Sequence, residues 1–182
     1  MFKYLLLIIF VITTSCVELT PEEKIIKDTL GKTLNINMFK TVKQGDNIIP
    51  FNEFRRKYNF ISVIYLEDSC TPCYPKYIDW INNMESITNK HGYTVLFIIK
   101  GHNYENFLKK IKIADPHYVP TDKEFYVAMD HDRYFLDNNR HINKWSIERS
   151  LLINAEDKVK LIGSPFNSPK MKELFNSICK EQ

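Results

Sequence analysis

Residues 60–73 read FISVIYLEDSCTPC, and the prediction of the fold begins from them. Its first seven residues form a near-continuous apolar run, rich in β-branched and aromatic side chains, which predicts a strand buried on both faces. Two cysteines separated by two residues follow, and beyond them a helix is predicted to about residue 90. Its apolar stripe has spacings of three and four: Tyr77, Trp80, Ile81, Met84 and Ile87. The sequence therefore places Cys70 and Cys73 at a strand-to-helix turn.

The segments that follow predict alternating strands and helices. They are a second buried strand at 93–99, a helix capped by Asn103, a short strand at 125–129, a hairpin of 150–154 with 159–162, and a last helix from Ser168. A βαβ unit followed by an antiparallel hairpin and a closing helix predicts an α/β fold, with a central mixed sheet and helices on both faces. Before residue 50 the pattern is weaker: a short helix at 21–28 and one or two edge strands around 34–39.

The first sixteen residues have the features of an export signal. Lys3 precedes a nine-residue apolar run, which is too short to span a bilayer as a helix, and Thr14, Ser15 and Cys16 follow. This segment resembles the bacterial lipoprotein signal, which implies acylation of Cys16. We expect a lipid-anchored, extracytoplasmic protein of the bacterial cell envelope. The alternative is a plain signal peptide in which Cys16 falls near the cut by chance.

The spacing of Cys70 and Cys73 suits thiol–disulfide exchange. At a strand-to-helix turn the two sulfurs are close enough to bond, and the helix N-terminus stabilises a thiolate at the first of them. The second cysteine, one turn further, would resolve the mixed disulfide. Cys70 is therefore the predicted attacking thiol and Cys73 the resolving one. Pro72 fits the first turn of the helix, where the backbone N–H that proline lacks would have no partner within the helix.

Residues 66–73 with the helix behind them resemble the active-site segment of thioredoxin-like proteins. The signal segment, the N-terminal extension and the tail at 151–165 resemble the membrane-anchored TlpA-type branch of that superfamily. The resemblance implies a redox-active Cys70–Cys73 disulfide, exported protein thiols or disulfides as substrates, an unknown recycling partner, and no cofactor or metal. The chain then divides into a signal peptide (1–15), a tether and N-terminal extension (16–50) and a thioredoxin-like domain (51–182).

Three positions depart from the family pattern. Ser69 stands where a Trp is common, and Lys76 where the TlpA-type branch often has Glu. The family also places a cis-proline before the strand matching 150–154, where its neighbouring backbone pairs with an extended substrate segment. No proline lies between His141 and Asn154, so we expect Glu148 or a neighbour beside Cys70.

Other interpretations remain open for the cysteines. Cys70 and Cys73 could form a purely structural disulfide, and the chain could be a non-catalytic binding or scaffold lipoprotein. A zinc site lacks further paired ligands, and a thiol peroxidase would need an activating arginine that neither Arg55 nor Arg56 clearly supplies. Cys179 is predicted to pack in the core. A net charge of only +3, from 25 basic and 22 acidic residues, argues against nucleic-acid binding.

Overall fold

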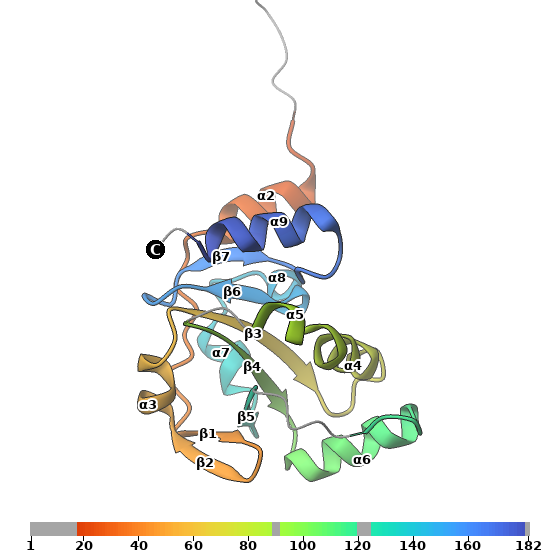
Figure 1. Ribbon diagram of the computed structural model, residues 1–182. Coiled ribbons are helices and arrows are strands. Elements are labelled where there is room, and N and C mark those ends of the chain that lie inside the picture. The colour runs from red at the N-terminus through yellow and green to blue at the C-terminus, as the bar shows by residue number, and fades with distance from the viewer. Residues whose placement is uncertain (1–17, 89–91, 120–124, 181–182) are drawn as a thin grey trace, which may run out of the picture.

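A seven-stranded mixed sheet forms the centre of the computed structural model, which describes residues 18–88, 92–119 and 125–180 (Figure 1). The strand order is β2-β1-β5-β4-β3-β6-β7. Strands β3, β4 and β5 run parallel, and the other neighbouring pairs are antiparallel. The strands are β1 Thr41–Gln44, β2 Asn47–Pro50, β3 Phe60–Glu67, β4 Tyr93–Lys100, β5 Tyr126–Asp130, β6 Leu151–Ile153 and β7 Val159–Ile162.

Helices cover both faces of this sheet, which confirms the predicted α/β class. Side chains of α4, α5, α6 and α9 pack in the core cluster on one face, and those of α3, α7 and α8 pack in the cluster on the other. The helices are α2 Pro21–Thr29, α3 Phe51–Arg56, α4 Cys73–Asn83, α5 Glu85–Thr88, α6 Tyr104–Ala114, α7 Tyr134–Asn138, α8 Lys144–Arg149 and α9 Pro169–Ile178. Within the described residues, no helix is long and apolar enough to cross a membrane.

Strand β3 shows why the apolar run folds as a central strand. Its side chains point alternately to the two faces, so that Ile64 and Leu66 pack with Trp80 in one cluster, while Val63 and Tyr65 pack in the other. All of these side chains are almost fully buried. A strand flanked by partners on both edges and helices on both faces needs apolar residues at nearly every position.

The described part of the N-terminal extension packs on this sheet. Thr20 and Glu23 form a reciprocal capping box that begins α2 one residue after Thr20. The expected edge strands at 34–39 are wrong: that stretch is irregular, although Leu34 and Ile36 are buried, and the strands are β1 and β2. Strand β1 joins the sheet by pairing with β5. The signal segment and Cys16 lie outside the described residues.

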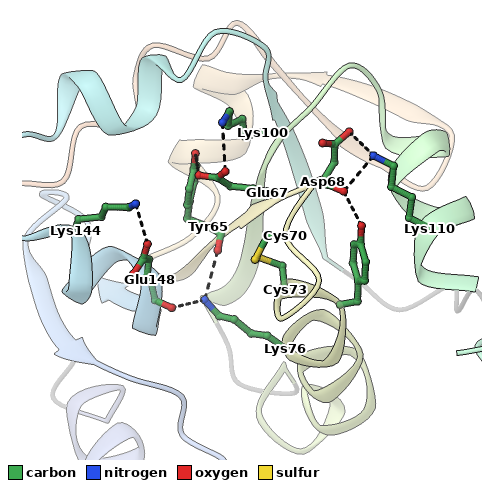
Figure 2. Close-up of a disulfide and its surroundings, with 11 residues drawn as sticks. Tyr65, Glu67, Asp68, Cys70, Cys73, Lys76, Lys100, Lys110, Lys144 and Glu148 are labelled. Atoms are coloured by element: carbon green, nitrogen blue, oxygen red, sulfur yellow. Dashed lines mark hydrogen bonds and ion pairs between the residues drawn. A yellow bond between two sulfur atoms is a disulfide. The ribbon is translucent and has the colours of Figure 1, made fainter. Parts of the chain in front are cut away.

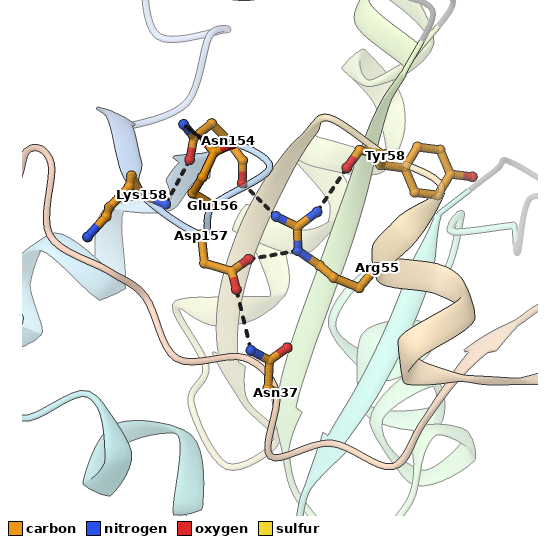
Figure 3. A network of polar contacts seen from close by, with 7 residues as sticks. All are labelled: Asn37, Arg55, Tyr58, Asn154, Glu156, Asp157 and Lys158. Atoms are coloured by element: carbon orange, nitrogen blue, oxygen red, sulfur yellow. Dashed lines mark hydrogen bonds and ion pairs between the residues drawn. The ribbon is translucent and has the colours of Figure 1, made fainter.

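Arg55 ties α3 to the turn between β6 and β7 (Figure 3). Its Nε donates to Asp157 Oδ1 at 2.7 Å, and its two terminal nitrogens donate to the carbonyl oxygens of Tyr58 and Asn154 at 2.9 and 2.6 Å. The side chains of Arg55 and Asp157 are only 12% and 13% exposed. A buried guanidinium with all three nitrogens bonded in this way is a structural clamp, which removes Arg55 as the arginine of a peroxidase site.

Other predicted elements agree with the structure to within a few residues. The strand at 93–99, the helix after Asn103, the strand at 125–129, the hairpin and the last helix all form. The helix predicted to reach residue 90 is instead two pieces, because α4 ends at Asn83 and α5 follows it. Helices α3, α7 and α8 were not predicted, since each has only five or six residues and carries too few turns to show a period.

Candidate functional site

Cys70 and Cys73 form a disulfide in the turn that joins β3 to α4, with their Cα atoms 5.3 Å apart (Figure 2). The Cys70 N–H donates to the Glu67 carbonyl oxygen at 3.1 Å, and the Cys73 N–H donates to the Cys70 carbonyl oxygen at 2.9 Å. Helix α4 begins at Cys73, with Pro72 as its N-cap. Cys70, the predicted attacking residue, therefore lies in the turn before the helix, and Cys73, the predicted resolving residue, is the first residue of the helix.

The two sulfurs have different surroundings. Both cysteines are half-buried, but only Cys73 packs against the core cluster formed with α4. Both cysteines border an open pocket. The assignment of Cys70 as the attacking thiol and Cys73 as the resolving one stays a prediction.

Asp68 fixes the turn that carries Cys70. Its N–H donates to the Lys100 carbonyl oxygen at 2.9 Å, and its carboxylate lies 3.2 Å from the Lys110 ammonium. The Tyr74 hydroxyl donates to the Asp68 carbonyl oxygen at 2.7 Å, which connects the turn to the first turn of α4. Gly101 leaves room for this arrangement, because a Cβ atom there would lie 2.8 Å from the Asp68 carboxyl group. Contacts with β4, α6 and the start of α4 therefore fix the cysteine turn in the absence of substrate.

A pocket of about 390 Å³ lies directly beside the disulfide. It is lined by Tyr65, Glu67, Cys70, Pro72, Cys73, Lys76, Lys144 and Glu148. Its charges come from three different elements: Glu67 from the end of β3, Lys76 from α4, and Lys144 and Glu148 from α8. Three of them are in ion pairs: Lys144 pairs with Glu148, and Glu67 pairs with Lys100, each at 3.3 Å.

Lys76 bridges the space between α4, β3 and α8 (Figure 2). Its Nζ donates to the Glu148 carbonyl oxygen at 2.7 Å and to the Tyr65 carbonyl oxygen at 3.4 Å. Burial lowers the pKa of Lys76 to about 8, the Glu148 carboxylate opposes this shift, and the Arg149 guanidinium adds to it. The amine therefore carries most of its charge at pH 7 and loses it in mildly alkaline solution.

Tyr65 forms another wall of the pocket. Its hydroxyl donates to Glu67 Oε1 at 3.4 Å, and its ring stacks on Phe135 with the ring centroids 5.5 Å apart. Burial, the main cause, together with the carboxylates of Glu67 and Asp130, raises the pKa of Tyr65 far above its usual value. Tyr65 is thus a neutral hydrogen-bond donor at any physiological pH.

The segment before β6 is a helix, at the place where the resemblance to thioredoxin-like proteins led us to look for a cis-proline. Helix α8 runs to Arg149, and Ser150 then turns the chain into β6 with φ of +91°. No cis peptide bond occurs in the described residues. As expected from the sequence, Glu148 lies at the same pocket as Cys70, two residues before the strand-entry position that Ser150 occupies.

The structure also locates the remaining residues that the sequence singled out. Ser69 is exposed in the turn before Cys70, and Cys179 is half-buried at the end of α9 against the core cluster, as predicted. Sequence reasoning missed Tyr65 and Glu67 as pocket residues, although their place at the end of the strand before the cysteines was a usable signal. It also missed Lys144, for which the sequence offers no signal, because its position depends on where α8 packs.

Neither a family model nor a curated protein matches this sequence. Solved structures do match. A proposed thiol:disulfide interchange protein DsbE from Chlorobium tepidum is 15% identical, with a TM-score of 0.54 over 82% of this chain and 97% of that one. A thiol-disulfide oxidoreductase from Bacteroides fragilis is 11% identical, with a TM-score of 0.53 over 79% and 99%.

A third solved structure is similar over a smaller share of its length. It is a proposed thiol-disulfide oxidoreductase from Bacteroides vulgatus, 17% identical, with a TM-score of 0.54 over 78% of this chain and 86% of that one. At such identities the likeness concerns the arrangement of the backbone. The mixed sheet, the helices on both of its faces and the disulfide between β3 and α4 belong to one recognisable architecture, and the chain has a thioredoxin-like fold.

Proposed function

We propose that this protein is a thiol–disulfide oxidoreductase that acts on exported proteins through Cys70 and Cys73. The observation that carries the proposal is the Cys70–Cys73 disulfide, which lies in a fixed turn beside an open pocket. A disulfide that served only to stabilise the fold would not need to be accessible to another molecule through a pocket. The similar solved structures, whose own names refer to this chemistry, add support.

The proposed direction is reduction of substrate disulfides. The Cys70 thiolate attacks one sulfur of the substrate disulfide and releases the other as a thiolate, which leaves a mixed disulfide on Cys70. The Cys73 thiolate then attacks the Cys70 sulfur, releases the second substrate thiol and forms the Cys70–Cys73 disulfide. A recycling partner must return two electrons and two protons to the pair. Acylation at Cys16 would hold the protein at the bacterial cell envelope, outside the cytoplasm.

Insulin reduction tests this activity. The full-length chain, purified in detergent and supplied with dithiothreitol, should accelerate precipitation of the insulin B chain, and Cys70→Ser should abolish the acceleration. Cys179→Ser is the matched control and should retain it, because Cys179 lies on α9 away from the pocket. A folded wild-type protein no faster than Cys70→Ser would favour the alternative, a binding or scaffold lipoprotein.

A further inference from the structure

The backbone of the segment that precedes β6, next to the cysteines, already forms hydrogen bonds within the protein. An extended polypeptide is usually recognised through main-chain hydrogen bonds to a free strand-like segment. Here the Ser150 N–H donates to the Ile147 carbonyl oxygen at 3.4 Å, and the Ser150 carbonyl oxygen accepts from the Gly163 N–H at 2.9 Å. The Glu148 carbonyl oxygen is covered by the Lys76 ammonium. A substrate strand could pair at this place only by displacing those bonds.

The conformation of the same segment also argues against pairing with a substrate strand. Residues up to Arg149 are helical, so their N–H and C=O groups run along the axis of α8 and do not form a ladder edge. Ser150, the one residue between α8 and β6, has φ of +91°, which lies outside the extended region. The side chains of the pocket, not its backbone, are therefore the groups that can recognise a substrate beside Cys70.

The side chains that line the pocket include positively and negatively charged groups. The Lys76 ammonium has three N–H groups, of which two donate to the carbonyl oxygens of Tyr65 and Glu148. In the part of the chain that the structure describes, Lys76 is in no ion pair. The Glu148 carboxylate is about half exposed, and among the described residues its ion pair is with Lys144 on its own helix. Besides the ion-paired Glu67 and Lys144, the pocket thus offers the Lys76 ammonium, which can bind a carboxylate, and the Glu148 carboxylate, which can bind an ammonium.

The volume limits the size of the ligand. About 390 Å³ lies near the lower end of the range of small-molecule pockets, and it suits a ligand of amino-acid or dipeptide size. The disulfide forms part of the wall, so a ligand in the pocket has its own sulfur atoms within reach of Cys70.

We propose that this pocket binds low-molecular-weight disulfides that carry α-amino-acid head groups, with the ligand carboxylate at Lys76 and its ammonium at Glu148. The inference rests on the proposed exchange at Cys70 and Cys73, and it adds a small zwitterionic class of substrate to protein disulfides. The Cys70 thiolate attacks the small disulfide RSSR, forms Cys70–S–S–R and releases one RS⁻. The Cys73 thiolate then displaces the second RS⁻ and closes the Cys70–Cys73 disulfide. Two electrons pass from the pair to RSSR, and the two protons of the dithiol end on the two released thiols.

Four disulfide probes of similar size test the proposal: cystine, a zwitterion; cystamine, which has two ammonium groups; dithiodiglycolate, which has two carboxylates; and neutral hydroxyethyl disulfide. The full-length chain in detergent is reduced, freed of reductant and mixed with each probe at pH 7. Acid-quenched mass spectrometry then follows formation of the Cys70–Cys73 disulfide. Each rate constant is divided by that of free dithiothreitol with the same probe, which removes intrinsic reactivity. We expect the normalised rate for cystine to exceed that for hydroxyethyl disulfide about tenfold, equivalent to about 1.4 kcal/mol, and the two singly signed probes to lie below cystine.

Variants identify the groups responsible. Glu148→Gln and Lys76→Met should each remove most of the preference for cystine. Glu173→Gln and Lys160→Met change the same charges at exposed positions away from the pocket and should preserve it. Because Lys76 also connects α4 to α8, circular dichroism checks its variant, and Glu148→Gln tests the proposal alone if Lys76→Met does not fold. Equal normalised rates for all four probes would overturn this inference and leave the proposed function standing. Failure of every probe to oxidise the pair would overturn the proposed function as well.

Discussion

At the scale of single residues, Lys76 and Glu148 place charges of opposite sign at the pocket that Cys70 borders, together with the ion-paired Glu67 and Lys144. The Lys76 ammonium favours a thiolate beside it, and the Glu148 carboxylate opposes one. Both side chains line the pocket that Cys70 borders, and the largely buried Lys76 ammonium is screened less by water than the half-exposed Glu148 carboxylate. The TlpA-type proteins that the sequence resembles often have Glu where this chain has Lys76, whose charge acts in the opposite direction.

The pH dependence of Cys70 alkylation measures this balance. After reduction, Lys76→Met should shift the profile of Cys70 to higher pH, because the cation that stabilises the thiolate is lost. Glu148→Ala should shift it to lower pH, and each shift should be about half a pH unit or more. Since the pKa of Lys76 is about 8, its help fades above that pH, and the wild-type and Lys76→Met rates should converge there. Profiles that coincide in all three proteins would show that neither charge acts on Cys70.

Ser150 is the most strained residue beside the site. Its φ of +91° is unfavourable for any residue with a Cβ, and its buried Oγ has no hydrogen-bond partner among the described residues. We expect Ser150→Gly to raise the free energy of unfolding by about 1 kcal/mol, because relief of strain and loss of an unpaired hydroxyl exceed the entropy that glycine costs. Urea unfolding of the reduced protein measures this. Ser150→Ala removes only the hydroxyl, so equal stability of the Gly and Ala variants would mean that the backbone is not strained.

At the scale of elements, the clamp at Arg55 holds the β6–β7 hairpin against α3. Loss of Arg55 leaves the mostly buried Asp157 carboxylate without its guanidinium partner, although Asn37 Nδ2 still donates to it. We expect Arg55→Met to lower the free energy of unfolding by about 3 kcal/mol in urea titrations. Arg140→Met breaks the exposed pair with Asp137, whose side chains are 79% and 53% exposed, and should change stability by less than about 0.5 kcal/mol. Equal effects of the two substitutions would mean that the clamp contributes nothing beyond a surface ion pair.

Elements also show which parts of the structure were predictable. The buried strands β3 and β4 and helices α4, α6 and α9 follow from local apolar patterns, because each buries a continuous face. Helix α7 has no such pattern, and contacts far along the chain stabilise it. Asn139 at its end accepts from the Asn35 N–H at 2.7 Å and donates to the Asn35 carbonyl oxygen at 2.9 Å.

In the site, too, local features were predictable and those that depend on long-range packing were not. Cys70, Cys73 and the approach of Glu148 were predictable from spacing and from the resemblance to thioredoxin-like proteins. The occupied backbone at Ser150 and the bridge made by Lys76 were not, because both depend on how α8 packs against β3. Long-range packing of a short helix leaves no periodic trace in the sequence.

At the scale of the whole molecule, the anchor would hold the domain close to the membrane. Only residues 17–20 separate Cys16 from the first residue of α2, so a fully extended chain between them measures at most about 18 Å. Helix α2 in turn packs on α8, the helix that carries Lys144 and Glu148. A lipid-anchored form would therefore meet its substrates near the bilayer surface, and its activity would be confined to molecules that reach that layer.

Expression in a bacterium with labelled fatty acid tests this placement. The wild-type chain should incorporate the label and partition with the detergent phase, because several acyl chains bind a bilayer stably. Cys16→Ser should lose the label and either appear in the aqueous phase or remain unprocessed. Cys179→Ser is the matched control, since it removes a cysteine from α9 and should keep both the label and the partitioning. An unlabelled wild-type protein in the aqueous phase would mean that residues 1–15 act only as an export signal. The short connection to α2 would then not hold the protein at a membrane.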